Sequence, residues 1–215
     1  MSDTEDTPPG SPPDGRAPRA YHHGDLSRAL IEAARRLLES EGAAALSLRA
    51  VAREAGVSPA APYHHFIDKN ALLDAVASGG WTALSDAVAA ARNAEGEATL
   101  TAIGMAYVAF ARDNPALYQL MYERIRQKEA LPTAYAGGAY DSVKKAVRRR
   151  AGQSVSGVDL ELATFAVWCA VHGLAEMRVF PRLEGLKTSL GGEEAFVSSV
   201  LDHLGVFQAP RTAGT

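Results

Sequence analysis

The chain contains very little cysteine. Among its 215 residues Cys169 is the single one, which excludes an internal disulfide framework and is typical of proteins in a reducing compartment. The first twenty residues contain no apolar run, so no secretory signal sequence is expected. The uncharged stretch from Leu162 to Ala175 is too short to span a bilayer and predicts a buried helix. Together these absences predict a cytoplasmic protein with no membrane partner.

Recognisable catalytic and metal-binding motifs are also absent from the sequence. It has no Gly-rich phosphate loop and no Gly-x-Ser-x-Gly elbow, and Cys169 lies in an apolar run typical of a core residue. The pairs His22-His23 and His64-His65 have no Cys or acidic residue at a ligand spacing, and Cys169 with His172 gives only two ligands. We therefore expect no catalytic residues, no metal, no cofactor and no enzyme activity. A small helical enzyme that uses the histidines is the least favoured alternative.

Positive charge is not in excess either. The net charge is −3, and residues 21–70 carry six Lys or Arg against six acidic residues. Charge alone therefore predicts no nucleic-acid surface, and a DNA-binding role must rest on a motif. One basic tract lies far from the motif described below and predicts a solvated helix face. Its residues are Lys144, Lys145, Arg148, Arg149 and Arg150.

Helical periodicity is present throughout the chain. The sequence is 47% hydrophobic, and no segment has the alternating pattern of a strand, so an all-α fold is predicted. Residues 180–192 are predicted to form a loop, and Gly79-Gly80 a soft point within one helix. The predicted helices cover residues 25–41, 48–55, a short segment from 58, 69–91, 98–112, 115–127, 132–151, 158–179 and 193–204.

The most informative segment is residues 46–73. A short helix breaks at Gly56 and restarts at Ser58-Pro59, which is the spacing of a helix-turn-helix whose second helix enters the DNA major groove. Gly56 supplies the backbone freedom of the turn, while Ser58 caps the next helix and Pro59 occupies its first position. Pro62 lies so early in that helix that it removes only about one intrahelical bond.

Residues 21–77 resemble the DNA-binding domain of TetR-family transcriptional regulators. The resemblance implies an N-terminal three-helix helix-turn-helix domain and a larger C-terminal helical domain for ligand binding and dimerisation. Pro62 departs from the family pattern, in which many members have an aliphatic residue. The matching residues are Ser47-Leu48, Val51-Ala52, Ala55-Gly56-Val57-Ser58, Tyr63, His65-Phe66, Lys69 and Leu72-Leu73.

The resemblance also implies which residues meet DNA. Small side chains at Ala60 and Ala61 allow close approach to base edges, and the Tyr63 hydroxyl and nearby imidazoles can donate to phosphates or bases. Lys69 opens a helix, where free N–H groups and the ammonium both favour a phosphate. Phe66 is expected to be a core residue. The predicted DNA-binding residues are Ser47, Ser58, Pro59, Ala60, Ala61, Tyr63, His64, His65 and Lys69.

A second informative segment is Leu162 to Ala175, which is apolar on every side and must be covered all round. We predict that the helices at 158–179 and 193–204 pair with their copies in a homodimer. Phe165, Trp168 and His172 fall at helical spacing and are expected to share a face. The pattern Trp168…His172-Gly173, with residues 114–118 upstream, resembles the C-terminal domain class of the TetR family named WHG for its Trp, His and Gly.

Aromatic and methionine residues of several predicted helices are candidates to line one cavity. Such walls suit a small, largely apolar or aromatic ligand, although an ordinary helical core has the same composition. The family resemblance favours the cavity. His172 is either a polar partner of the ligand or a satisfied core histidine. The predicted ligand-binding residues are Trp81, Met105, Phe110, Tyr118, Met121, Tyr122, Phe165, Trp168 and His172.

The sequence therefore predicts a ligand-responsive repressor that binds double-stranded, palindromic operator DNA as a homodimer. A ligand-independent DNA-binding regulator is the alternative. Residues 1–20 are rich in Pro, Gly, Ser, Thr and Asp, and Arg16 and Arg19 belong either to a DNA-contacting arm or to an idle tail. The predicted divisions are a disordered tail at 1–20, a helix-turn-helix domain at 21–70, a regulatory and dimerisation domain at 71–207, and a disordered tail at 208–215.

Overall fold

The structure is a computed structural model that describes residues 23–128, 138–152, 156–177 and 180–204. Within these ranges every regular element is a helix, which confirms the all-α prediction. The tails predicted to be disordered, the two arginines of the N-terminal arm and the predicted helix start at residue 132 lie outside the described residues.

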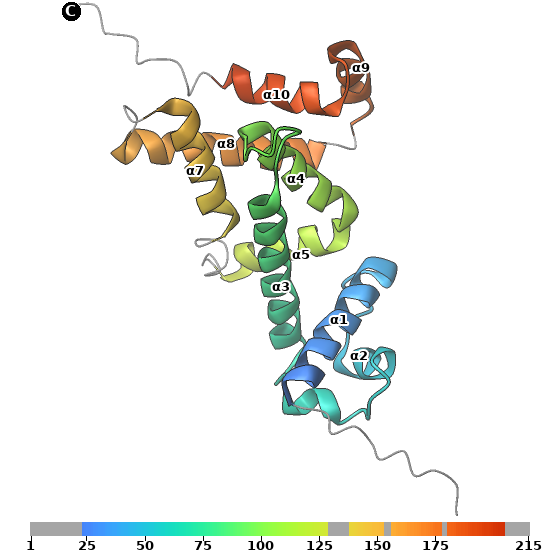
Figure 1. Cartoon of the computed structure of the whole chain (residues 1–215). Coiled ribbons are helices and arrows are strands. Elements are labelled where there is room, and N and C mark those ends of the chain that lie inside the picture. Colours follow the sequence, from blue (N-terminus) through green and yellow to red (C-terminus); the bar gives the residue numbers. More distant parts are fainter. Residues whose placement is uncertain (1–22, 129–137, 153–155, 178–179, 205–215) are drawn as a thin grey trace, which may run out of the picture.

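A long central helix, α3 (Lys69–Ala90), joins two groups of helices (Figure 1). We call the first group, together with the first turns of α3, the head; it consists of α1 (His23–Glu41), α2 (Leu48–Glu54) and η1 (Ala61–His64). We call the second group, with the remainder of α3, the body. The body helices are α4 (Leu100–Asp113), α5 (Pro115–Lys128), α7 (Ala139–Ala151), α8 (Gly157–Met177), α9 (Pro181–Leu190) and α10 (Glu193–His203).

The head is held together by the amphipathic helix α1, which packs on α2 and α3. The Ser47 hydroxyl caps α2 by accepting the N–H of Ala50 at 3.1 Å. Gly56 then turns the chain with a φ of +69°, a conformation that favours glycine. Both observations match the predicted helix-turn-helix. The buried residues of α1 are Leu30, Ala33, Ala34, Leu37 and Leu38, which recur at helical spacing.

The element that follows the turn is the 3-10 helix η1, and not the α-helix predicted from Ser58. Its bonds span three residues, from Ala61 N to Ser58 O (3.0 Å) and from His65 N to Pro62 O (3.0 Å). Pro62 explains the difference, because it has no N–H to donate to the Ser58 carbonyl and disfavours the α conformation at the preceding residue. Ser58 consequently lies before η1, and the predicted capped helix starting at Ser58-Pro59 is wrong.

Helix α3 begins where the sequence predicted, with the Asp68 carboxylate accepting the N–H of Ala71 at 2.8 Å. The helix continues through Gly79-Gly80, where a soft point was predicted. Gly80 instead permits close approach to α5: a Cβ there would lie 2.6 Å from Met121 Sδ and 3.0 Å from Leu117 Cδ1. At Gly79 the nearest atom to such a Cβ, Ile31 Cγ2, is 4.0 Å away.

Helix α8 is central to the body and packs on α4, α7 and α10. Among the described helices it alone is long and apolar enough, by length and composition, to cross a membrane, a test that core helices of soluble proteins also pass. Only 39% of its apolar window is buried within the single chain, and Cys169, which was predicted to be a core residue, is exposed. The buried residues of α8 are Leu160, Ala163, Thr164, Val167, Trp168, Val171 and Ala175.

The loop predicted at 180–192 is wrong for most of its length, because Pro181 to Leu190 form the helix α9. Pro181 occupies the first turn, where the missing N–H has no cost. Gly191 ends the helix in the left-handed conformation, with a φ of +96°, and Gly192 N donates to Lys187 O at 2.8 Å. The proline and the glycines are thus the start and stop signals of a helix and do not mark a loop.

Candidate DNA-binding surface and regulatory core

The predicted DNA-binding residues of the turn and η1 lie largely on the surface of the head. Ser58, Pro59, Ala60 and His64 are exposed, and the Tyr63 side chain is 54% exposed. Two members are partly covered: Ala61 is half-buried, and His65 is half-buried with its ring 6.4 Å from that of Phe66. Phe66 is buried, which confirms its predicted place in the core.

Two predicted DNA-binding residues have partners within the head. The exposed Ser47 uses its oxygen to cap α2, and its hydroxyl proton can still be donated to a phosphate. The Lys69 ammonium donates to the carbonyl oxygen of Ala43 at 2.9 Å. Because an ammonium has three N–H groups, this bond leaves Lys69 able to contact a phosphate as well. Their DNA contacts stay predictions.

Ile67 was not among the predicted DNA-binding residues. Its side chain is 87% exposed, the largest exposed fraction among the large apolar residues of the described head. It lies between η1 and Asp68, the N-cap of α3. At this position an apolar residue often packs back on the fourth residue of the helix, here Leu72. Leu72 is fully buried and Ile67 is not, so the Ile67 side chain remains on the surface of the head. In the sequence, a large apolar residue directly before a capping Asp is the signal that could have identified Ile67 as a candidate surface residue.

Aromatic rings from five helices meet in the body. The Tyr107 ring of α4 lies edge-on to Trp168 of α8 (5.3 Å between centroids) and to Tyr118 of α5 (6.0 Å). The Tyr122 ring lies 5.2 Å from Trp81 of α3 and 4.3 Å from the His172 imidazole of α8. Edge-to-face and tilted pairs at such distances are favourable arrangements. We call this group the aromatic cluster; its residues are Trp81, Tyr107, Tyr118, Tyr122, Tyr140, Trp168 and His172.

Hydrogen bonds connect the polar atoms of the aromatic cluster. The Tyr118 hydroxyl lies 2.5 Å from His172 Nδ1 and 3.1 Å from the Tyr107 hydroxyl. The Tyr107 hydroxyl also bonds the hydroxyl of Tyr122. These bonds form one network through α4, α5 and α8. Because hydroxyls can either donate or accept, the direction of donation can reverse when one member changes its partner.

The network is electrically neutral at ordinary pH. Burial raises the pKa of Tyr107 and Tyr118 well above the usual tyrosine value, and it raises the pKa of Tyr122 to about 12. Burial also lowers the pKa of His172, because the imidazolium form is disfavoured away from water. A molecule that binds these groups would therefore meet neutral donors and acceptors.

The structure brings together five of the nine predicted ligand residues, Trp81, Tyr118, Tyr122, Trp168 and His172. Three others lie elsewhere in the body: Met121 is buried under Gly80, Phe110 is buried on α4, and Met105 is half-buried on the same helix. Tyr107, the centre of the network, was not predicted. It belongs to the buried face of α4, and its helical spacing from Gly104 and Ala111 was a usable signal.

Phe165, which was expected to share a face with Trp168 and His172, has a side chain that is 56% exposed, while Trp168 is buried. The first half of α8 lacks a cover on that side. Phe165 instead lines an open hollow of about 620 Å³, together with Val158, Leu162 and Tyr140. Tyr140 also belongs to the aromatic cluster, so this hollow borders the cluster.

Two family models match this helical chain. The model of "Bacterial regulatory proteins, tetR family" matches residues 30–76, and that of the "Tetracyclin repressor-like, C-terminal domain" matches residues 100–204. The chain belongs to the TetR family. This confirms the predicted class, a DNA-binding transcriptional regulator with a helix-turn-helix. The first match includes α2 and η1, and the second includes every body helix from α4 to α10.

Individual proteins are similar to this chain in sequence or in fold. The HTH-type transcriptional regulator YobS of Bacillus subtilis (strain 168) is 27% identical over 106 residues, 49% of this chain and 56% of that protein. The match thus spans only about half the length of this curated relative. A protein of unknown function from Rhodococcus sp. RHA1 is 32% identical, with a TM-score of 0.66 over 87% of this chain and 97% of that one. The multidrug binding protein EbrR, solved with imidazole, shares the fold at 22% identity, with a TM-score of 0.54 over 91% and 100% of the two chains.

Proposed function

We propose that this TetR-family protein is a repressor that releases operator DNA when a small molecule binds its body. The observation that carries the proposal is the aromatic cluster, in which hydrogen-bonding groups are embedded among rings of five helices. Ligand sites in proteins combine apolar walls with a few well-placed polar groups, which is the composition of this cluster. The fold relative EbrR is itself a multidrug-binding protein.

The proposed ligand is a small, largely apolar or aromatic molecule with one neutral hydrogen-bonding group. The rings of Trp81, Tyr122 and Trp168 would contact its apolar part, and Tyr118 or His172 would exchange a partner with its polar group. His172 has two ring nitrogens, and the Tyr118 hydroxyl uses one of them. The resemblance of Trp168…His172-Gly173 to the WHG class belongs to this proposal.

We further propose that the operator is bound by a homodimer formed through the helices at 158–179 and 193–204. Val158, Leu162 and Phe165 recur at helical spacing on α8, and each is more than half exposed in the single chain. A contiguous apolar stripe of this kind is typical of an interaction surface. Dimerisation would place two heads on half-sites about one helical turn apart, or a multiple of it, so a palindromic operator is expected.

The exposed turn and η1 of each head would then meet the major groove. Tyr63 and His64 are available to phosphates or bases, and Ala60 is small enough for close approach. Lys69 would add a phosphate contact. In this proposal residues 21–70 bind DNA and residues 71–207 regulate, with α3 as the shared helix, and the protein acts in the cytoplasm without catalysing a reaction.

A ligand-independent regulator is the second candidate, and one observation favours it. The hydroxyls and imidazole of the cluster already satisfy one another, as a solid core would require. Thermal shift against a compound panel separates the two candidates, because a ligand that binds only the folded state raises the melting temperature. Compounds that stabilise the wild type, and fail to stabilise a Trp168→Ala variant that still folds, support the ligand site. Stabilisation that is equal in both proteins contradicts it.

A further inference from the structure

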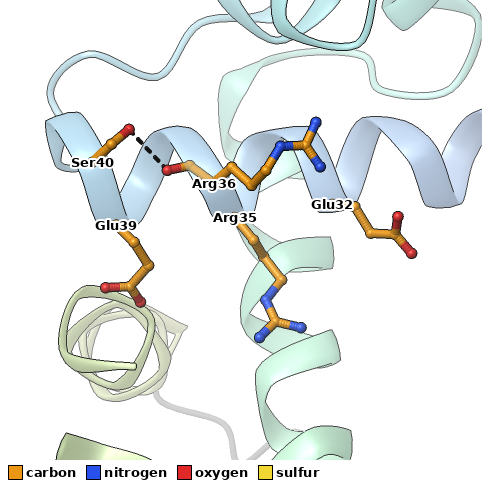
Figure 2. A pocket seen from close by; sticks show the side chains of 5 residues that line it. All are labelled: Glu32, Arg35, Arg36, Glu39 and Ser40. Atoms are coloured by element: carbon orange, nitrogen blue, oxygen red, sulfur yellow. Dashed lines mark hydrogen bonds between the residues drawn. The ribbon is translucent and has the colours of Figure 1, made fainter. Parts of the chain in front are cut away.

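A carboxylate of the head caps a helix of the body. Glu39, near the end of α1, accepts the backbone N–H of Leu117 through Oε1 at 2.9 Å and that of Ala116 through Oε2 at 3.2 Å. Figure 2 shows Glu39 pointing from α1 toward α5, with Arg35 on the same side. Both donors belong to the first turn of α5, which begins at Pro115. One side chain thus joins α1 to α5 by two charge-assisted hydrogen bonds.

The sequence around the start of α5 explains why the cap comes from another helix. Pro115 has no N–H, so Ala116 and Leu117 carry the first free donors of the helix. Asn114, the residue that normally supplies a local cap, donates its side-chain amide to Phe110 O at 3.0 Å instead. Its Oδ1 accepts from Arg35 of α1 at 3.4 Å. The positive end of the α5 dipole also favours the Glu39 carboxylate.

The other end of α5 is joined to the head as well. Arg124 forms an ion pair with Asp74 of α3 at 2.7 Å and donates to Asn70 at 3.4 Å. The Arg124 side chain is only 11% exposed, so this pair is partly removed from water. Because Asn70 and Asp74 lie in the first turns of α3, both ends of α5 are tied to the head.

The middle of α5 carries two members of the aromatic cluster. Tyr118 directly follows the capped Leu117, and Tyr122 lies one turn later. A movement of α5 that carries these rings with it therefore also displaces the N–H groups that donate to Glu39. Helix α5 is rigid at this scale, because its backbone bonds fix one turn relative to the next.

We infer that Glu39 is a positioning residue that sets the orientation of the head on the body and makes it depend on α5. We call the contacts of Glu39, Arg35 and Asn114 between α1 and the start of α5 the joint. The inference that a ligand acts through the joint rests on the proposed function. The joint itself rests only on the contacts of Glu39, Arg35 and Asn114. A head held in one orientation matches its DNA site in a larger fraction of molecules than a head that samples several.

The test compares full-length Glu39→Gln with wild type and with Glu32→Gln. Glu32 lies on the same helix, lines one surface hollow of α1 together with Glu39, and has a 4.0 Å pair with Arg28. Both substitutions remove one negative charge from α1, but only Glu39→Gln weakens the cap of α5. The DNA probes are a duplex selected by the wild type from a random library and a scrambled duplex of the same composition. The ratio of their affinities cancels the general effect of charge on DNA binding.

We expect the affinity ratio of Glu39→Gln to be at least about fivefold lower than that of Glu32→Gln. Amide exchange of the segment containing Ala116 and Leu117 should also be faster in Glu39→Gln, because a neutral amide accepts more weakly than a carboxylate. A melting transition within a few degrees of the control shows that the fold is retained. Glutamine is chosen as the replacement because it keeps one acceptor oxygen. An unchanged ratio, or unchanged exchange, overturns the inference. If the ratio falls but no stabilising compound alters DNA binding in any variant, the joint stands and the ligand-responsive function fails.

Discussion

His172 combines a polar contact with partial burial. Its Nδ1 lies 2.5 Å from the Tyr118 hydroxyl, and its ring lies 4.3 Å from that of Tyr122. Burial lowers its pKa, so the folded protein keeps the imidazole neutral at a pH where a free imidazole, with a pKa of about 6.5, is already protonated. As pH falls through that ordinary value the unfolded chain binds the proton first, and stability is lost.

The pH dependence of stability should therefore change when His172 is removed. Between about pH 7.5 and pH 5.5, the melting temperature of wild type should fall further than that of His172→Phe. At the higher pH the variant should lose about 1 kcal/mol of stability, because Tyr118 keeps its bond to Tyr107. Scanning calorimetry of both proteins across this range measures the difference. Parallel curves for the two proteins would show that His172 titrates in the fold as it does in the unfolded chain.

Lys69 is expected to bind a phosphate while it also contacts the Ala43 carbonyl. Lys69→Ala should weaken binding to all DNA sequences and reduce the slope of log K against log salt by about one unit or less. Lys145→Ala, at an exposed position of α7, is the matched control and should leave both quantities unchanged. Fluorescence anisotropy titrations at several salt concentrations provide the measurement. A slope for Lys69→Ala equal to that of the control would remove this residue from the DNA surface.

At the scale of elements, the contact between α3 and α5 depends on adjacent glycines with opposite surroundings. A Cβ at Gly80 would collide with Met121 and Leu117, whereas a Cβ at Gly79 would only come within 4.0 Å of Ile31. Gly80→Ala should destabilise the protein by about 1–3 kcal/mol, because the new methyl group forces buried neighbours to move. Gly79→Ala should be neutral or stabilise by up to about 1 kcal/mol through helix propensity. Urea unfolding of both variants compares them; a larger loss for Gly79→Ala would contradict the described packing.

The elements show which parts of this fold a sequence can predict. Helices α1 and α3 were predictable because Asp68, Gly42 and regular apolar spacing mark their ends and faces. The form of η1 was not, since one missing N–H at Pro62 decides between α and 3-10 bonding. Helix α9 was missed because proline and glycine mark both loops and helix ends, and only the left-handed φ of Gly191 distinguishes them.

Part of the candidate site was also predictable from the sequence. Trp168 and His172 were found by resemblance and helical spacing, and the structure places both in the aromatic cluster. Phe165 has the same spacing but is exposed and is not a member of the aromatic cluster. Helical spacing predicts the direction in which a side chain points, but it does not predict how far neighbouring helices cover that side. The cap by Glu39 joins residues 77 and 78 positions apart, and nothing local in the sequence indicates it.

At the scale of the whole molecule, the exposed stripe of α8 predicts a dimer interface. Phe165→Glu places a charge on this stripe, and burying an unpaired charge at an interface is strongly unfavourable. The variant should be monomeric at micromolar concentration, where wild type should be dimeric, while its helical content is retained. The equivalent change at an exposed residue of α9, Leu186→Glu, should leave the dimer intact. Sedimentation velocity distinguishes these results, and a dimeric Phe165→Glu would contradict the proposed interface.

The central claim is that a molecule bound at the aromatic cluster lowers the affinity of the heads for DNA. Its most direct test is a titration of wild-type protein, bound to its selected duplex, with a compound that raises the melting temperature of the free protein. The compound should reduce DNA affinity at least about fivefold, because it favours a conformation whose heads no longer match their half-sites. A compound that stabilises the wild type, fails to stabilise Trp168→Ala, and yet leaves the affinity for the selected duplex unchanged would contradict the account.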